Sequence, residues 1–141
     1  MNGRQTEAIT DWLCKRVRQG FCDGPFDLDT KFDFPLHTIP LFPVNKPELH
    51  KYRTIAHGSY RRGDRLSIND HISEEYIRIR YITLKEIVSM LVAAGPHAWM
   101  WARDIEDAFY NVPLAKSEFC LMGMKWCGKL WIFNVFTHGY R

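Results

Sequence analysis

The chain has 141 residues, of which 46% are hydrophobic and 14% aromatic, enough to build the core of one domain of ordinary size. This composition excludes disorder over most of the chain, and a net charge of only +3 excludes a strongly basic or acidic balance overall. Charged residues interrupt every apolar stretch before the ~18 residues that a membrane helix needs, so we expect a soluble protein with no membrane partner.

The first two segments have opposite backbone preferences. Residues 7–19 place apolar side chains at helical spacing, so we expect an amphipathic helix that Thr6 caps and Gly20 ends. Residues 21–47 carry most of the chain's seven prolines. Because proline removes a backbone donor, this segment is expected to form edge strands or extended chain. The cations expected to point outward from the helix are Lys15, Arg16 and Arg18.

The middle of the chain predicts two strands and a helix. Residues 51–56 and 76–81 are expected to be short strands on either side of a polar loop, residues 58–70. Thr83 and Glu86 then have the spacing of a capping box, and Gly95-Pro96 is a stop signal. We therefore expect a helix between them, with one apolar face formed by Leu84, Ile87, Val88 and Leu91.

The last third is predicted to be mainly strand. An apolar run from residue 98 predicts a strand that ends at Asp104, followed by a turn or short helix through Phe109. Residues 119–126 and 129–136 predict a hairpin with Cys127-Gly128 at its bend, because glycine suits a positive φ there. Without a regular βαβ alternation, the elements indicate an α+β fold, mainly antiparallel, with two or three helices.

Six cationic residues gather within twenty positions and are opposed there only by Glu48 and Asp64. This local excess can attract phosphate, although a charge run taken alone usually forms a solvated loop. The six cations are Lys46, Lys51, Arg53, Arg61, Arg62 and Arg65.

The four cysteines show no Cys-x-x-Cys spacing, and the N-terminus has no signal-peptide pattern. We therefore expect a reduced, intracellular protein, with cytoplasm and nucleus not distinguished. A zinc site from Cys120, Cys127 and a histidine is conceivable, but a spacing of seven favours ordinary buried thiols.

Asp104 has two interpretations. A carboxylate at a strand end, followed by the Ile105 carbonyl, resembles one half of a magnesium site, and nucleotidyl transfer uses two such cations ~3.5 to 4 Å apart. Alternatively, Asp104 caps a helix and Asp107 lies favourably in its first turn. The local pattern alone favours the cap, and Phe109 alone favours a core residue.

An ordered set of short motifs changes this weighing. The upstream motifs are Gly24-Pro25-Phe26, Pro40 to Pro47, Lys46 with Arg53, and Ser67-Ile68-Asn69-Asp70. The downstream motifs are Ala94-Gly95-Pro96, Arg103-Asp104-Ile105, Ala108-Phe109, Val112-Pro113-Leu114, Leu121-Met122-Gly123, Trp126 and Gly128. Over about residues 7–141 this order resembles the N-terminal part of a reverse transcriptase, especially the polymerases of tyrosine-recombinase retrotransposons.

The resemblance implies the fingers and partial palm of a right-hand polymerase in a single partial domain. Residues 1–96 would form the N-terminal helix, the proline-rich segment and the fingers, and residues 97–141 the first palm strand, the metal-site turn and the hairpin. The implied activity is RNA-directed DNA synthesis with Mg²⁺ or Mn²⁺. The implied partners are an RNA or DNA template-primer and deoxynucleoside triphosphates; the oligomeric state is not implied.

The resemblance also assigns residue roles. Asp104 would be a catalytic metal ligand and Ile105 would offer its carbonyl. Phe109 would be the steric gate, because an aromatic ring under the sugar leaves no room for a 2′-hydroxyl. The other implied nucleotide contacts are Lys46, Arg53 and Gly139, and the implied template contacts are Arg61, Arg62 and Arg65.

The sequence also departs from the family pattern. Where the family has Pro-Phe-Gly-Leu-Arg or Pro-Gln-Gly after the hairpin, only Gly139 and Arg141 match in Thr137-His138-Gly139-Tyr140-Arg141. The Tyr-x-Asp-Asp element that supplies the other metal-binding carboxylates is absent from the 141 residues. We therefore expect neither tight metal binding nor polymerase activity from these residues alone. The alternatives are a non-catalytic nucleic-acid-binding remnant, using the basic loop and the first helix, and an unrelated interaction domain.

Overall fold

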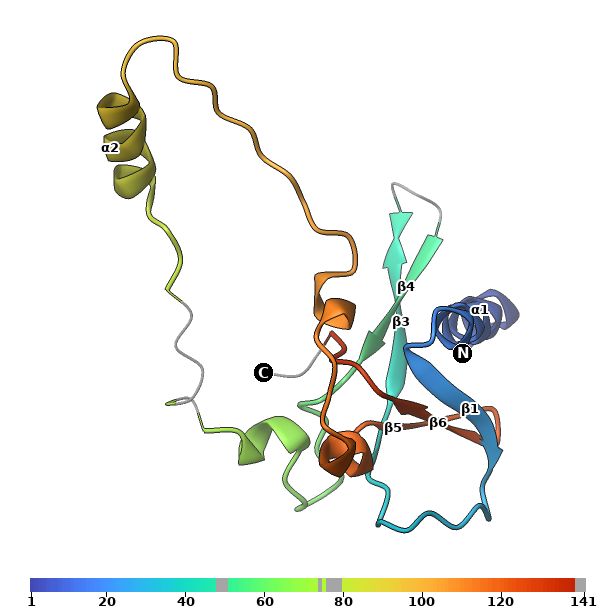
Figure 1. Ribbon diagram of the computed structural model, residues 1–141. Helices are drawn as coiled ribbons and strands as arrows, with labels where there is room; N and C mark the ends of the chain where they lie inside the picture. Colours follow the sequence, from blue (N-terminus) through green and yellow to red (C-terminus); the bar gives the residue numbers. More distant parts are fainter. Residues whose placement is uncertain (48–50, 74, 76–79, 139–141) are drawn as a thin grey trace. The chain divides into compact units, whose positions relative to one another are not determined.

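The computed structural model describes residues 1–47, 51–73, 75 and 80–138 (Figure 1). Its contacts divide the chain into two compact units, Met1–Ile72 with Asp107–Arg141, and Ser73–Glu106. The elements form an α+β fold with antiparallel and mixed sheets. The bounds of these units differ from the expected division into residues 1–96 and 97–141. The assignment of those two parts to fingers and palm stays a prediction.

Helix α1 (Gly3–Arg18) begins one turn earlier than expected. Asn2, not Thr6, is the N-cap, because Asn2 and Gln5 form a reciprocal capping box. The helix ends before Gly20, whose φ of +74° is a conformation that glycine adopts without strain. Its apolar face buries Ile9 and Leu13 completely and packs against β1, β3 and β4 (Figure 1).

The four-stranded sheet has the order β1-β6-β5-β2. Strands β1 (Cys22–Asp27) and β2 (Thr38–Ile39) come from the proline-rich segment. They lie at the two edges of this sheet, which confirms the expected edge strands. In β1 the register shifts between Asp23 and Phe26, around Pro25. Strand β2 pairs parallel with β5, while the other pairs are antiparallel, so the sheet is mixed.

The expected C-terminal hairpin is present as β5 (Gly123–Trp126) and β6 (Lys129–Phe133). Cys127 and Gly128 have φ angles of 46° and 73°, the positive values of a tight two-residue hairpin turn. The first strand is shorter than predicted, because residues 119–121 belong to the 3₁₀ helix η5 (Lys116–Leu121).

A second, two-stranded sheet consists of β3 (Leu41–Lys46) and β4 (Lys51–Ala56), and the latter confirms the predicted strand. The 3₁₀ helix η2 (Ile68–His71) follows in the loop after β4, and η4 (Ala108–Asn111) precedes η5. The largest side chains without solvent exposure are Phe133, Ile9, Leu13 and Met124. Trp12 stacks on Phe133 with 5.3 Å between ring centroids, which joins α1 to this core.

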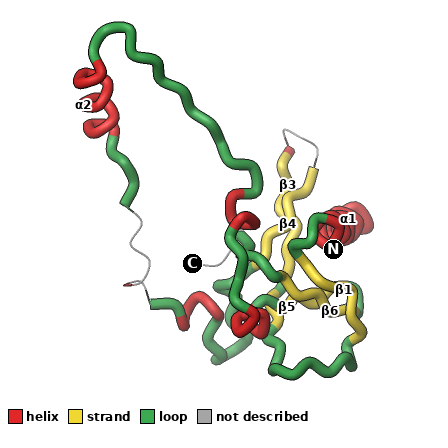
Figure 2. Tube along the Cα trace, in the orientation of Figure 1, coloured by secondary structure: helices red, strands yellow, loops and turns green. Residues whose placement is uncertain are grey.

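In the second unit, helix α2 (Leu84–Ala94) has the predicted capping box at Thr83 and ends at Gly95. None of its residues is buried, and the described residues on either side of it, 80–83 and 95–106, are loop (Figure 2). The expected strand into Asp104 is wrong: residues 98–104 join no ladder, and Trp99 is 97% exposed. A strand needs partner groups, and no described segment supplies them. Residues 76–79 of the expected strand 76–81 fall outside the described residues, and residues 80 and 81 are loop.

Within the described ranges, no helix combines the length and the apolar character needed to cross a membrane.

Gly123 allows the close approach of β2 to β5. A Cβ there would lie 2.5 Å from the His37 carbonyl oxygen and 2.8 Å from Leu36 Cγ. We expect Gly123→Ala to lower the free energy of unfolding by about 1–3 kcal/mol, because backbone must shift. Urea unfolding followed by circular dichroism measures the change. Gly3→Ala is the control, since its added methyl meets nothing within 4 Å, and equal stabilities of the two variants would contradict the prediction.

Candidate functional site

The guanidinium of Arg16 is buried at the end of α1, with only 5% of the residue exposed. Nη1 and Nη2 donate to the two carboxylate oxygens of Asp107 at 2.6 and 3.1 Å, and Nη1 also donates to Gln19 at 2.8 Å. The guanidinium lies over the Tyr110 ring, 4.0 Å from its centroid. The expectation that Arg16 points outward is therefore wrong, because a partner 91 residues away neutralises its charge in the interior.

Asp107 is the residue that precedes η4, in the left-handed region with φ of 54°. Its carboxylate makes no cap bond, because Arg16 engages both oxygens. Asp107 also shows that the cap interpretation of Asp104 is wrong, because η4 begins after residue 107. The hydrogen bonds from Arg16 hold the pKa of Asp107 below its usual range.

Three aromatic rings, those of Phe109, Tyr110 and His138, meet next to this ion pair. The Phe109 ring meets the His138 ring edge-on at 4.7 Å, and Tyr110 meets it at 5.8 Å. Burial and the nearby Arg53 charge lower the pKa of His138, so the imidazole is neutral at pH 7. The structure thus places the predicted residue Phe109 in contact with a histidine to which the sequence assigned no role, and Arg53 is near enough to this histidine to lower its pKa. Phe109 keeps 43% of its surface exposed and accessible to a ligand.

Lys46, another predicted nucleotide contact, lies on the same hairpin as Arg53. The β3–β4 register pairs Val44 with Arg53 and Lys46 with Lys51. Paired residues share a face, and so do residues two apart in one strand, so the three cations lie on one face. This face is the more exposed one, and no described residue forms an ion pair with these cations.

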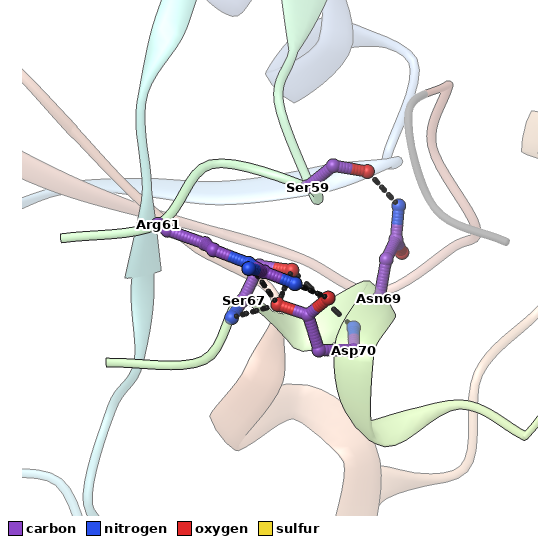
Figure 3. A network of polar contacts seen from close by, with 5 residues as sticks. All are labelled: Ser59, Arg61, Ser67, Asn69 and Asp70. Atoms are coloured by element: carbon purple, nitrogen blue, oxygen red, sulfur yellow. Dashed lines mark hydrogen bonds and ion pairs between the residues drawn. The ribbon is translucent and has the colours of Figure 1, made fainter. Parts of the chain in front are cut away.

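The basic loop is partly neutralised. Arg61 donates from Nε and Nη2 to Asp70 at 2.8 and 2.7 Å, and Ser67 donates to the same carboxylate (Figure 3). These bonds lower the pKa of Asp70, with the Arg61 hydrogen bond as the largest cause. Arg62 and Arg65 are exposed and have no ion pair among the described residues.

Asp104 and Ile105 belong to the second unit and are exposed. No hydrogen bond or ion pair within the described ranges involves the Asp104 carboxylate. No three histidine, cysteine or acidic side chains gather there as a metal site either. Gly139 lies outside the described residues.

All four cysteines are free, but Cys120 and Cys127 are not the buried thiols that were expected: Cys120 is half-buried and Cys127 is exposed. Cys22 is buried and Cys14 is exposed.

Comparison with solved structures shows what fold this is. The chain is similar to native prototype foamy virus protease-reverse transcriptase, with a TM-score of 0.64 and 15% sequence identity over 99% of its length. A selenomethionine-labelled mutant of the same protein gives a TM-score of 0.63 and 17% identity over 100% of the chain. Foamy viral protease-reverse transcriptase in complex with double-stranded DNA gives a TM-score of 0.62 and 15% identity over 99% of the chain. The chain therefore has a reverse-transcriptase-like fold, and spans 16–21% of these proteins.

No protein-family model matches the sequence, and no curated protein matches it significantly. The likeness to reverse transcriptases shown by these comparisons thus lies in the three-dimensional fold.

Replacing Asp107 by Asn tests the buried pair. The variant leaves the desolvated Arg16 charge without its counter-ion, so we expect a loss of about 1–3 kcal/mol in the free energy of unfolding at pH 7. Because folding lowers the pKa of Asp107, its contribution is present above the unfolded pKa of about 3.9 and is lost as the pH falls through the lower folded value.

The difference between wild type and Asp107→Asn should accordingly shrink as urea unfolding is repeated from pH 7 towards about pH 2. Asp11→Asn, an exposed position on α1 with the same charge change, is the control. A pH-independent difference, or an equal loss in the control, would contradict a structural role of the pair.

Proposed function

We propose that these 141 residues are the fingers and partial palm of an RNA-directed DNA polymerase of a retroelement. The observation that carries the proposal is the similarity of the whole chain to one part of solved reverse transcriptases, with TM-scores up to 0.64. The ordered motifs, from Gly24-Pro25-Phe26 to Leu121-Met122-Gly123, support the same assignment. The tyrosine-recombinase retrotransposons remain the proposed source within this class.

Nucleic acid is the proposed partner of the cationic face on β3 and β4. Lys46, Lys51 and Arg53 occupy one exposed face of a hairpin, a spacing that suits consecutive phosphates. Two of the solved relatives are complexes with double-stranded DNA, in agreement with a nucleic-acid partner. The exposed Arg62 and Arg65 are a second proposed phosphate contact, whereas Arg61 is already paired with Asp70.

The nucleotide is proposed to bind where Arg53, Phe109 and His138 converge. Arg53 offers a charge without a described counter-ion, which suits a triphosphate. The edge contact with His138 orients the Phe109 ring, and an oriented ring can reject a 2′-hydroxyl by steric exclusion. Phe109 is therefore the proposed gate for deoxyribonucleotides.

The described residues do not fit a two-metal site. Asp104 is a lone exposed carboxylate, Asp107 is engaged by Arg16, and the sequence contains no Tyr-x-Asp-Asp. Bridging two divalent cations requires further carboxylates. We therefore derive no catalytic step from these residues, and propose that Mg²⁺ or Mn²⁺ would act only in a polymerase that supplies them.

A non-catalytic nucleic-acid-binding remnant is the second candidate. The exposed cations favour it, because they need no metal to bind phosphate. A reading frame that continues past Arg141 into Tyr-x-Asp-Asp would favour the polymerase, and its absence the remnant.

Primer extension tests the catalytic part of the proposal. With an RNA template, a DNA primer and Mg²⁺, we expect no template-dependent extension by the 141-residue chain, because the other metal-binding carboxylates are missing. Asp104→Asn should be indistinguishable from wild type. Synthesis by the wild type that disappears in Asp104→Asn would overturn the proposal that these residues are inactive alone.

Fluorescence anisotropy with a labelled RNA–DNA hybrid tests binding. We expect an affinity that falls with salt, and a salt slope about one unit smaller for Arg53→Gln, because one phosphate contact is removed. Lys125→Gln, an exposed cation on β5, controls for net charge. Absence of binding at low salt, or equal slopes for both variants, would contradict a nucleic-acid interface on β3 and β4.

A further inference from the structure

The first unit contains a preformed apolar pocket of about 470 Å³, a volume typical of small-molecule sites. Its lining combines residues that are far apart in the chain, from η2, η5 and the segment after β6. Aliphatic and aromatic side chains predominate, and the polar ones are His37, His71 and Glu118. The apolar lining includes Ile68, Ile72, Leu114, Met122 and Phe136.

A smaller, more polar pocket of about 190 Å³ adjoins it, and the two share His37 and Leu66. Arg62 and Arg65 line this second pocket. Neither guanidinium has an ion pair among the described residues, and a backbone hydrogen bond of 3.2 Å joins the two positions. The apolar pocket and the space that carries two exposed cations thus meet at His37 and Leu66.

Hydrogen bonds fix the two segments that carry the shared residues His37 and Leu66. The His37 amide donates to Cys120 O at 2.7 Å, and Gly123 N donates to His37 O at 3.1 Å. On the other side, Asp70 holds the start of η2 through Ser67 and Arg61 (Figure 3). Because both segments are held by these hydrogen bonds, little ordering cost remains for a ligand.

The charges that line the two pockets favour an anionic ligand. Arg62 and Arg65 line the smaller pocket, and the larger pocket has a single carboxylate, that of Glu118. Burial, Arg62 and His71 lower the pKa of His37, which leaves this imidazole neutral at pH 7 and able to donate one hydrogen bond and accept another.

We propose that the two pockets together bind a small amphipathic anion, with its apolar body among Ile68, Leu114 and Met122 and its carboxylate or similar head group at Arg62 and Arg65. This site uses none of the residues proposed to bind the nucleotide, but it does share Arg62 and Arg65 with the second proposed phosphate contact. Saturable binding of decanoate in the absence of nucleic acid tests it separately from the proposed polymerase origin.

Isothermal titration calorimetry with decanoate below its micelle concentration tests the proposal. The full chain should bind decanoate saturably at one site, and bind decanol and decyltrimethylammonium more weakly. Arg62→Gln with Arg65→Gln should weaken decanoate at least about tenfold and leave decanol unchanged, because only the charge-assisted contacts are lost.

Two further variants separate the pocket from other surfaces. Leu66→Glu places a like charge at the junction and should abolish decanoate binding, and this residue is 54% exposed, so the fold tolerates the change. Arg4→Gln with Arg18→Gln, two exposed cations of α1, should change nothing.

The proposal is overturned by an absence of saturable binding, by equal decanoate affinity in the Arg62/Arg65 variant, or by tighter binding of the cationic probe. Loss of binding on Val88→Ser with Val92→Ser would also overturn it, because the exposed surface of α2 would then be the site.

Discussion

The buried ion pair between Arg16 and Asp107 is the interaction on which the candidate site depends. The Arg16 guanidinium joins the last turn of α1 to Asp107, 91 residues later, and lies over Tyr110, which contacts the core residue Phe133. Because Arg16 is only 5% exposed, its charge is stable there only beside a counter-ion, so the turn before η4 is held against the helix. Nη1 and Nη2 make the hydrogen bonds of this contact, while Nε has no partner among the described residues. Phe109 and His138 are positioned through this turn.

Elements specified by neighbouring residues were predicted well. The capping box at Thr83, the two-residue bend Cys127-Gly128 and the prolines at sheet edges act over a few residues, so the sequence displays them directly. Errors occurred where two local signals competed. Asn2 with Gln5 outweighed Thr6 as a cap, and the start of the predicted hairpin became η5.

Features that need a distant partner were not predictable. Arg16 has the position of an outward cation, and nothing near it in the sequence reveals Asp107 as a partner. The run before Asp104 has strand composition but no partner strand in the described chain. Of the candidate site, the motif order named Arg53 and Phe109 as nucleotide contacts, and these roles stay predictions. It missed His138, because contact between rings 29 positions apart leaves no local pattern.

A double-mutant cycle on Arg16 and Asp107 tests this account most directly. Urea unfolding of Arg16→Gln, Asp107→Asn and the double variant gives the coupling energy between the two side chains. We expect a coupling of about 1–3 kcal/mol, since both partners are needed for the contact. Costs that add within about 0.5 kcal/mol would show that the pair does not hold the site together and would contradict the account.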